Sequence, residues 1–378
     1  MLLDPSPDQA FLRETTARFL DERIPVEEVR RLRDDPAGFR PEYWRAGAEL
    51  GWTGLLVDEA LGGGSLSEFG LVDLTLLAYE FGRHAAPGPL GPTNVVAELL
   101  GRHPDGHQDA LDALIAGTST AAWCFAETRP GSRAASPPVE IRVDGADLVL
   151  DGTARPVEAA VSADLLLVTG RTGDARTNLL LPRDTPGVLV TPLNSIDVTR
   201  RYATVEFREV RVPAAAALGG VAEGARDAEH ALRTALVVSC AETVGALQAA
   251  FDLTLDWAFD RYAFGRPLAS YQEIKHRFAD MKSWLEGAHA IADRAAEAVA
   301  RDSADAAELV SAAKAFVGDY GGELIQDCVQ IHGGIGVTYE HDLHLFARRA
   351  AAGRANHGTP AEHRSRLAGI VELQEATR

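Results

Sequence analysis

The stretch that decides the fold is a strand between two helical regions, Val205-Glu206-Phe207-Arg208-Glu209-Val210-Arg211-Val212. Apolar and polar residues largely alternate along it, which is typical of a strand with one buried face. Before it, from Val139 onward, short alternating runs are separated by turn residues such as Asp144-Gly145. These runs predict a small antiparallel β-barrel or sandwich in residues 118–217.

The residues on both sides of this β region follow a helical period. Between residue 8 and about residue 115, apolar side chains recur at steps of three and four, as in Leu71, Leu74 and Ala78. After Pro213 the chain is again helical, with long alanine-rich segments. An α–β–α order without βαβ units, and without a GxGxxG turn after a strand, argues against a Rossmann fold. We expect an α+β multidomain protein with an N-terminal helical domain (1–117), a middle β domain (118–217) and a C-terminal helical bundle (218–378).

Composition narrows the class of protein. At 378 residues the chain exceeds the usual size of a single hydrophobic core. Its formal net charge of −18 argues against binding to nucleic acid or to an anionic membrane, because both need a basic face. The three cysteines form no CxxC pair, which indicates neither a disulfide framework nor a metal site. The N-terminus does not resemble a signal peptide, and no charge-free apolar run reaches the ~20 residues of a membrane-spanning helix. We expect a cytoplasmic protein.

A first segment with binding chemistry lies where a long helix, from about Leu232 to Phe259, ends and another begins. It reads Arg261-Tyr262-Ala263-Phe264-Gly265-Arg266-Pro267-Leu268. The planar guanidinium of an arginine donates two parallel hydrogen bonds and therefore suits a diphosphate, whereas a phenylalanine can pack against a ring. The alternative interpretation is a plain corner between two helices with an arginine on the surface.

A second segment is rich in glycine and reads Gln330-Ile331-His332-Gly333-Gly334-Ile335-Gly336-Val337-Thr338. Paired glycines let the backbone approach a ligand closely and leave amide N–H groups free for phosphate oxygens. The alternative interpretation is an ordinary break between two helices.

With these two segments the chain resembles the acyl-CoA dehydrogenase family from end to end. Further matches lie at Leu50 to Val57, Glu59 to Gly63, Tyr79 to Arg83, Glu127 to Ser132 and Gly152-Thr153. The resemblance implies an N-terminal helical domain, a β domain and a C-terminal four-helix bundle, assembled as a dimer of dimers. It also implies oxidation of an acyl-CoA with FAD bound across a subunit interface, and an electron-transfer flavoprotein as the oxidant.

The resemblance further implies which residues contact FAD. Arg261 and Phe264 are expected at the diphosphate and adenine side of a flavin held mainly by a neighbouring protomer. Gln330, Gly333 and Gly334 are expected to meet the same moiety from the opposite subunit. The remaining family positions for contacts to flavin or CoA fall on Gln272, Glu127, Thr128 and Ser132.

The chain is most similar to an actinobacterial branch of the family that includes dehydrogenases of steroid side chains. The similarity lies in the run from Thr338 to Leu345 and in the turn Asp197-x-Thr199-Arg200. Several enzymes of that branch are heterotetramers of two different subunits, so this chain is expected to form a homo- or heterotetramer.

The sequence departs from the family where the catalytic base is expected. Dehydrogenation needs a carboxylate that removes the α-proton while flavin N5 accepts the β-hydride. In much of the family a glutamate precedes a Gly-Thr pair near the C-terminus, but here His357 precedes Gly358-Thr359. A second family position, on the long C-terminal helix, falls on Ala235.

Glu242 is the candidate base that remains. It is the single charged residue between Arg233 and Asp252, in a helix that is apolar around most of its circumference. A buried carboxylate is costly unless it is paired or used, and desolvation raises its pKa. The alternatives are a core glutamate hydrogen-bonded to Arg or His of a neighbouring helix, and His357 as the acid–base group. A histidine near the end of a chain is, however, more often exposed and without a role.

The strand that faces the flavin also departs from the family. Where many relatives have Trp-Ile-Thr or Trp-Ile-Ser, this chain continues from Gly152-Thr153 with Ala154-Arg155-Pro156-Val157-Glu158. Three functions therefore compete: an FAD-dependent acyl-CoA dehydrogenase with Glu242 as base, a partner subunit that completes a flavin site in another chain, and an enzyme of non-oxidative acyl chemistry.

Overall fold

The computed structural model describes residues 5–125 and 137–376. Six α-helices precede the first strand in the described chain: α1 (Pro7–Arg23), α2 (Val26–Arg31), α3 (Pro41–Glu49), α4 (Gly70–Arg83), α5 (Leu90–Arg102) and α6 (Gln108–Ile115). Local sequence explains several of their ends. Ser6 and Gln9 form a capping box at the start of α1. Before α4, Gly62 adopts a left-handed conformation with φ of +88°, which glycine tolerates without a steric penalty.

The middle of the chain forms one eight-stranded sheet. Its strands are β1 (Ala121–Cys124), β2 (Val139–Asp144), β3 (Asp147–Glu158), β4 (Leu165–Thr172), β5 (Ala175–Pro182), β6 (Val188–Leu193), β7 (Tyr202–Pro213) and β8 (Ala217–Leu218). The order is β6-β7-β3-β2-β4-β5-β8, with β1 beside β4. The sheet is mixed, because β4 pairs in parallel with β1 and β2, whereas we expected antiparallel pairing throughout. A parallel pair needs a crossover connection instead of a tight turn, and the chain between β1 and β4 contains β2 and β3.

The strand that decided the fold, β7, contains a β-bulge. Val205 and Phe207 are buried, and so are Val210 and Val212, so the alternation slips by one residue in between. At the slip Glu209 has a φ of +48°, and its N–H donates to Oδ1 of Asp151. An extra residue of this kind restores the buried face after the irregularity.

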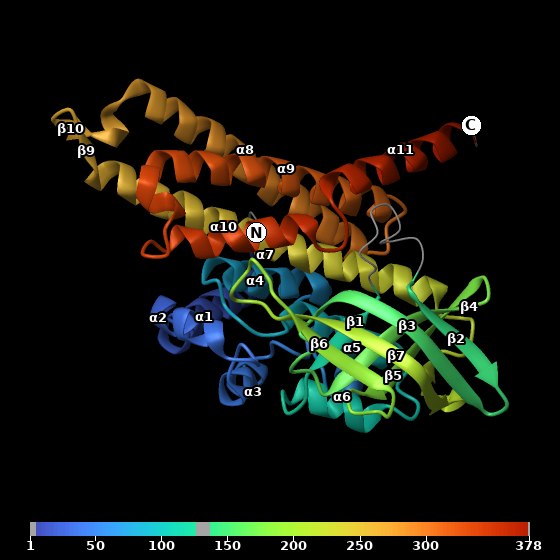
Figure 1. The fold of residues 1–378 in the computed structure, drawn as a ribbon. Helices are drawn as coiled ribbons and strands as arrows, with labels where there is room; N and C mark the ends of the chain where they lie inside the picture. The colour runs from blue at the N-terminus through green and yellow to red at the C-terminus, as the bar shows by residue number, and fades with distance from the viewer. Residues whose placement is uncertain (1–4, 126–136, 377–378) are drawn as a thin grey trace.

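The last part of the chain is helical, as expected. It contains α7 (Ala225–Asp260), α8 (Gln272–Ala300), α9 (Ala306–His332), α10 (Leu343–Ala355) and α11 (Pro360–Ala376). A small hairpin of β9 (Tyr262–Ala263) and β10 (Arg266–Pro267) joins α7 to α8 and projects from one end of the molecule (Figure 1). The helix α7 is long and apolar enough to cross a membrane, but 83% of its most apolar window is buried inside the protein.

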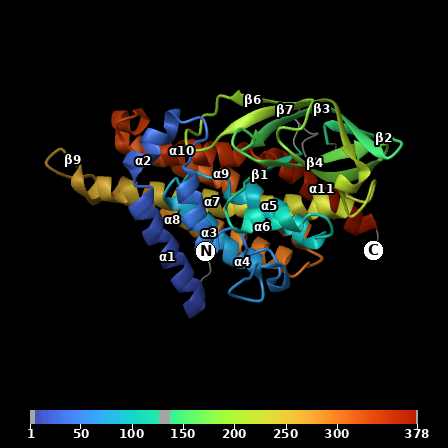
Figure 2. The ribbon, with the colours of Figure 1, turned by 90° about the horizontal axis from the view of Figure 1, so that it is seen from below.

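The core has two parts. The N-terminal helices and the C-terminal bundle share one apolar cluster, and the inner face of the sheet forms a second one. The bundle lies across both the N-terminal helices and the sheet, which stand next to each other (Figures 1 and 2). The region where these three parts meet therefore brings together residues that are far apart in sequence.

Candidate active site

A pocket opens where α5, the ends of β1 and β3, the turn before β7, α7 and the end of α10 meet. Its apolar wall is formed by Pro92, Val95, Trp123, Phe125, Leu232 and Val238. The rings of Trp123 and Phe125 are stacked, with centroids 4.5 Å apart and planes 9° from parallel. Its polar lining consists of Glu158, Asp197, Arg200, Tyr202, Ser239, Glu242, Thr243, Arg349, Asn356 and His357. A mostly apolar cavity with a few convergent polar groups is the usual form of a small-molecule site.

Glu242 lies in this pocket as one half of an ion pair. Nη2 of Arg200 donates to Oε1 of Glu242 over 2.6 Å, and the side chains are only 5% and 15% exposed respectively. One alternative interpretation of Glu242 was a core glutamate hydrogen-bonded to an Arg or His of a neighbouring helix. Glu242 does pair with an arginine, but this arginine lies in a turn of the β domain. Within the described chain, the second oxygen of Glu242, Oε2, has no hydrogen-bond partner.

Arg200 binds a second carboxylate of the pocket as well. Its Nε lies 3.2 Å from Oε1 of Glu158, at the end of β3. Burial raises the pKa of Glu158 to about 7, the charge of Arg200 works against this rise, and the charge of Glu242 reinforces it. Glu158 is therefore a carboxyl group that exchanges its proton near neutral pH, inside the pocket.

The turn that carries Arg200 is fixed by a second arginine. Nε of Arg349, on α10, lies 3.4 Å from Oδ2 of Asp197, and both side chains are buried. Oδ1 of Asp197 accepts hydrogen bonds from the backbone N–H and the hydroxyl group of Thr199. Arg349 also donates to the carbonyl oxygens of Phe81 and Ala86. The two arginines thus tie the β domain, the N-terminal helices and the bundle together around the pocket.

His357 is not exposed, contrary to our expectation. It is half-buried and lines the pocket, in a left-handed conformation with φ of +56° just after α10. Burial, together with the positive charge of Lys314, lowers its pKa to about 3. The imidazole is therefore neutral at physiological pH. The tertiary structure places this residue in the pocket because α10 ends there, a position that its closeness to the end of the chain did not reveal.

The three positions that we compared for the catalytic base lie in the same pocket. Glu242, His357 and Ala235 all line it, although they come from two different helical regions. Glu158 was missed. Its side chain lies on the same face of β3 as that of Pro156, because alternate residues of a strand point the same way, and both residues line the pocket. The departure from Trp-Ile-Thr in this strand was the signal that could have identified it.

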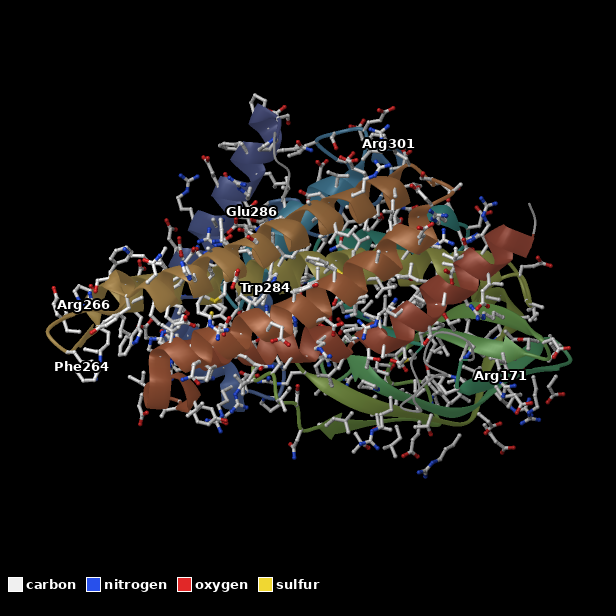
Figure 3. The ribbon with its side chains drawn as sticks, turned by 90° about the horizontal axis from the view of Figure 1, so that it is seen from above. Arg171, Phe264, Arg266, Trp284, Glu286 and Arg301 are labelled. Atoms are coloured by element: carbon white, nitrogen blue, oxygen red, sulfur yellow. The ribbon has the colours of Figure 1, made fainter. Side chains whose placement is uncertain are left out.

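The segments expected to bind the diphosphate lie elsewhere, at the end of the bundle that carries the hairpin. Phe264 is 100% exposed, and Figure 3 shows it with Arg266 at the tip of the hairpin. The other expected contacts are also exposed: Arg261, Gln272, Gln330, Gly333 and Gly334. Glu127, Thr128 and Ser132 lie outside the described residues.

The two exposed segments lie near each other within one chain. The guanidinium of Arg261 lies 5.9 Å from the centre of the Trp257 ring, and Trp257 stacks on His332 with centroids 5.3 Å apart. His332 directly precedes Gly333, so the arginine corner and the glycine turn form one surface. The close return of α9 beside the end of α7 produces this proximity.

Known proteins share this combination of domains. Residues 6–110 match the N-terminal domain of acyl-CoA dehydrogenases, and residues 222–371 match their C-terminal domain. The chain is 30% identical over 368 residues to the acyl-CoA dehydrogenase IpdE2 of Mycolicibacterium smegmatis, covering 97% of this chain and 99% of that protein. The chain belongs to the acyl-CoA dehydrogenase family. The resemblance read from the motifs is thereby confirmed, and this acyl-CoA dehydrogenase is an FAD-dependent oxidoreductase acting on CH–CH bonds.

Solved structures show the same fold. Butyryl-CoA dehydrogenase from Megasphaera elsdenii has a TM-score of 0.88 at 21% identity, covering 98% of this chain and 100% of that chain. The ChsE4–ChsE5 complex from Mycobacterium tuberculosis has a TM-score of 0.88 at 23% identity, covering 98% of this chain and 99% of that chain. The expected order of helical domain, β domain and helical bundle is that of these proteins.

The two ends of the acyl-CoA dehydrogenase fit FAD unequally. At the hairpin end the donors suit a diphosphate: Arg261 is exposed, and the positions where Gly333 and Gly334 lack a Cβ face open space. In the pocket, the stacked rings of Trp123 and Phe125 offer a flat apolar wall, and β3 contributes Pro156 and the carboxyl group of Glu158, with no aromatic ring or hydroxyl group in Ala154 to Glu158. The exposed donors of the hairpin end thus suit a diphosphate, whereas the pocket combines an apolar wall with a carboxyl group.

Proposed function

We propose that this chain catalyses the α,β-dehydrogenation of an acyl-CoA and that Glu242 removes the α-proton. The supporting observation is the orientation of one carboxylate: Arg200 holds Oε1 of Glu242, and among residues 5–125 and 137–376 nothing pairs with Oε2, in a pocket with an apolar wall. A base needs one oxygen that can reach the substrate, and a fixed second oxygen limits the positions that the first can take.

Glu242, Arg200 and His357 have different roles in the proposed reaction. The α-C–H bond breaks, its proton passes to Oε2 of Glu242, and Arg200 keeps the carboxylate in place before the transfer. FAD, when bound, accepts the hydride from the β-carbon. The neighbouring His357 has its pKa lowered to about 3, so its ring is uncharged at neutral pH and offers one N–H donor and one acceptor nitrogen to the pocket.

Geometry favours a flavin shared between two chains. Glu242 and Asp260 are 18 residues apart on the continuous helix α7, which corresponds to about 27 Å at 1.5 Å per residue. Arg261 of one chain is therefore remote from the pocket of the same chain, and it would serve a flavin whose ring lies in another protomer. We propose a tetramer, either homomeric or heteromeric, with an electron-transfer flavoprotein as oxidant. The three cysteines are free and buried, which agrees with a cytoplasmic location.

Anaerobic bleaching of the flavin tests this function. The purified protein is mixed without oxygen with short, branched and steroid-like acyl-CoAs, and the loss of the flavin absorption band is followed. We expect bleaching by at least one substrate, and a rate reduced about 10²- to 10⁴-fold in Glu242→Gln. Asp252→Asn is the matched control, because Asp252 lies on the same helix and pairs with Arg83. Unchanged bleaching in Glu242→Gln would exclude Glu242 as the base, and a flavin that no acyl-CoA bleaches would favour non-oxidative chemistry.

A second candidate is a partner subunit that binds the diphosphate and adenine of a flavin whose ring belongs to a different chain. The observation in its favour is the pair Pro156 and Glu158, which replaces the aromatic ring and hydroxyl group in the pocket. A colourless protein that becomes yellow only when co-expressed with the product of a neighbouring gene would support this candidate. A protein that is yellow when purified alone supports the first.

A further inference from the structure

Arg200 directs most of its donors at groups of the protein itself. A guanidinium has five N–H donors in a rigid fork. Nη1 lies 2.5 Å from the carbonyl oxygen of Gly88 and 3.3 Å from that of Ala86, both between α4 and α5. Nε faces Glu158 and Nη2 donates to Glu242. Four of the five donors are thus directed at the protein itself, so the fork has one orientation that the fold determines.

The charges of the pocket do not balance when every group is ionised. Asp197 faces Arg349 as a buried pair of opposite charge. The other two carboxylates, Glu158 and Glu242, both pair with Arg200, which carries a single positive charge. With Glu158 protonated, Arg200 neutralises Glu242 alone, whereas with Glu158 ionised the two carboxylates share one cation. The two carboxylates therefore compete for one guanidinium, and the ionisation state of Glu158 determines how much of the charge of Arg200 acts on Glu242.

We propose that Arg200 is a positioning residue for Glu242, and that Glu158 modulates the reactivity of Glu242 by competing for this shared arginine. This inference rests on the proposed function of Glu242. Proton abstraction from the substrate is therefore faster when Glu158 has lost its own proton.

Four charged groups, which lie on the turn before β7, on α7 and on α10, influence the ionisation of Glu158. Arg200 and Asp197 belong to the turn before β7, Glu242 lies on α7, and Arg349 lies on α10. Tyr202 is also close, and its hydroxyl group accepts a hydrogen bond of 2.6 Å from Nδ2 of Asn356. Burial raises the pKa of this tyrosine well above its usual value, with Glu158 as a further cause, so it stays neutral while Glu158 titrates. The titration near neutral pH is thus that of the carboxyl group.

The test compares Glu158→Gln with the wild type in rapid-mixing measurements of anaerobic flavin bleaching between pH 5.5 and pH 9. We expect the bleaching rate of the wild type to rise with a step near the pKa of Glu158, about 7. In Glu158→Gln the step disappears, and the rate at pH 8.5 falls about tenfold, because a neutral amide no longer competes with Glu242 for the charge of Arg200. KM changes less than twofold, because Glu158 acts through Arg200 and not on the substrate. Glu206→Gln is the control, since Glu206 is an ion-paired carboxylate on β7, outside the pocket.

A second measurement does not depend on catalysis. The infrared difference spectrum between low and high pH is expected to contain a protonated carboxyl band that disappears on passing pH 7 and is missing in Glu158→Gln. Arg200→Lys, which retains the charge but not the fork, is expected to bleach more slowly than wild type and faster than Arg200→Gln. An unchanged pH step in Glu158→Gln, with activity lost in Glu242→Gln, would overturn this inference and leave the proposed function intact. Full activity in Glu242→Gln would overturn both.

Discussion

Gly82 on α4 and Gly245 on α7 let the two helices touch through their backbones. A Cβ atom on Gly82 would overlap the carbonyl oxygen of Glu242 and lie 2.9 Å from the backbone nitrogen of Ala246. A Cβ atom on Gly245 would overlap the carbonyl oxygen of Tyr79 and lie 3.0 Å from the backbone nitrogen of Arg83. The glycine three residues after Glu242 is therefore a packing residue. It holds the backbone of the proposed base against the N-terminal domain.

Substitution of this glycine is expected to destabilise the protein. In Gly245→Ala the added methyl group meets backbone atoms, which cannot move as a side chain does, so we expect a loss of about 1–3 kcal/mol in the free energy of unfolding, measured by chemical denaturation. Gly322→Ala, on α9, is the matched control. It faces open space and should be neutral or stabilising by up to about 1 kcal/mol, because alanine favours a helix over glycine. Equal effects of both substitutions would contradict the packing argument.

Because of Glu158, the free energy of unfolding is expected to depend on pH at pH values above the ordinary pKa of a glutamate. Its pKa in the folded protein is about 7, against 4.5 for the ordinary carboxyl group, so the folded state binds the proton more tightly than the unfolded state. Stability therefore falls as the pH rises from about 4.5 to about 7. Between pH 5 and pH 8.5, Glu158→Gln should gain stability relative to wild type, on the order of 1–3 kcal/mol. A constant difference between the two proteins across this range would exclude the predicted titration.

The buried histidines are expected to act in the opposite direction. His357 and His363 have pKa values lowered by burial to about 3 and about 4, and Nε2 of His363 lies 3.0 Å from the carbonyl oxygen of His357. The unfolded chain takes up these protons below pH 6.5 and the folded protein does not, so stability is lost as the pH falls from about 6.5 towards 3.

His357→Asn tests this loss, because asparagine tolerates the left-handed conformation at this position. At pH 4.5 the variant should lose less stability than wild type, by about 1–3 kcal/mol in denaturation experiments. His276→Asn is the control, since His276 is exposed on α8. If both variants follow the acid sensitivity of wild type, burial of His357 does not cause it.

Substitutions at the hairpin end are expected to weaken FAD binding without affecting folding. Arg261 and Phe264 are exposed, so Arg261→Gln and Phe264→Ala should change the free energy of unfolding by less than about 0.5 kcal/mol. The Kd for FAD should rise at least about tenfold in each, measured by flavin fluorescence during titration of the apoprotein. Phe11→Ala, an exposed phenylalanine on α1, is the control. Unaltered flavin affinity in both hairpin variants would remove this surface from the FAD site.

The period of the apolar residues was sufficient to predict the element types. The helical steps around Leu71 and Leu74 correspond to α4, and the alternation in residues 205–212 corresponds to β7. Local chemistry of this kind is visible in sequence because it depends on residues only two to four positions apart. The parallel neighbours of β4 were not predictable in this way, since they depend on the order of strands that are distant along the chain.

The residues that meet in the pocket were also only partly predictable from the sequence. Sequence alone identified Glu242 as the solitary charge of an apolar helix, predicted a binding role for the arginine and glycine segments, and led to the acyl-CoA dehydrogenase family. Only the tertiary structure placed Arg200 between Glu242 and Glu158, His357 inside the pocket, and the two exposed segments next to each other in one chain. The physical reason is that segments distant in sequence determine which group pairs with a charge and how deeply a side chain is buried. Desolvation and nearby charges then shift the pKa of a group, and neither can be read from its neighbours in sequence.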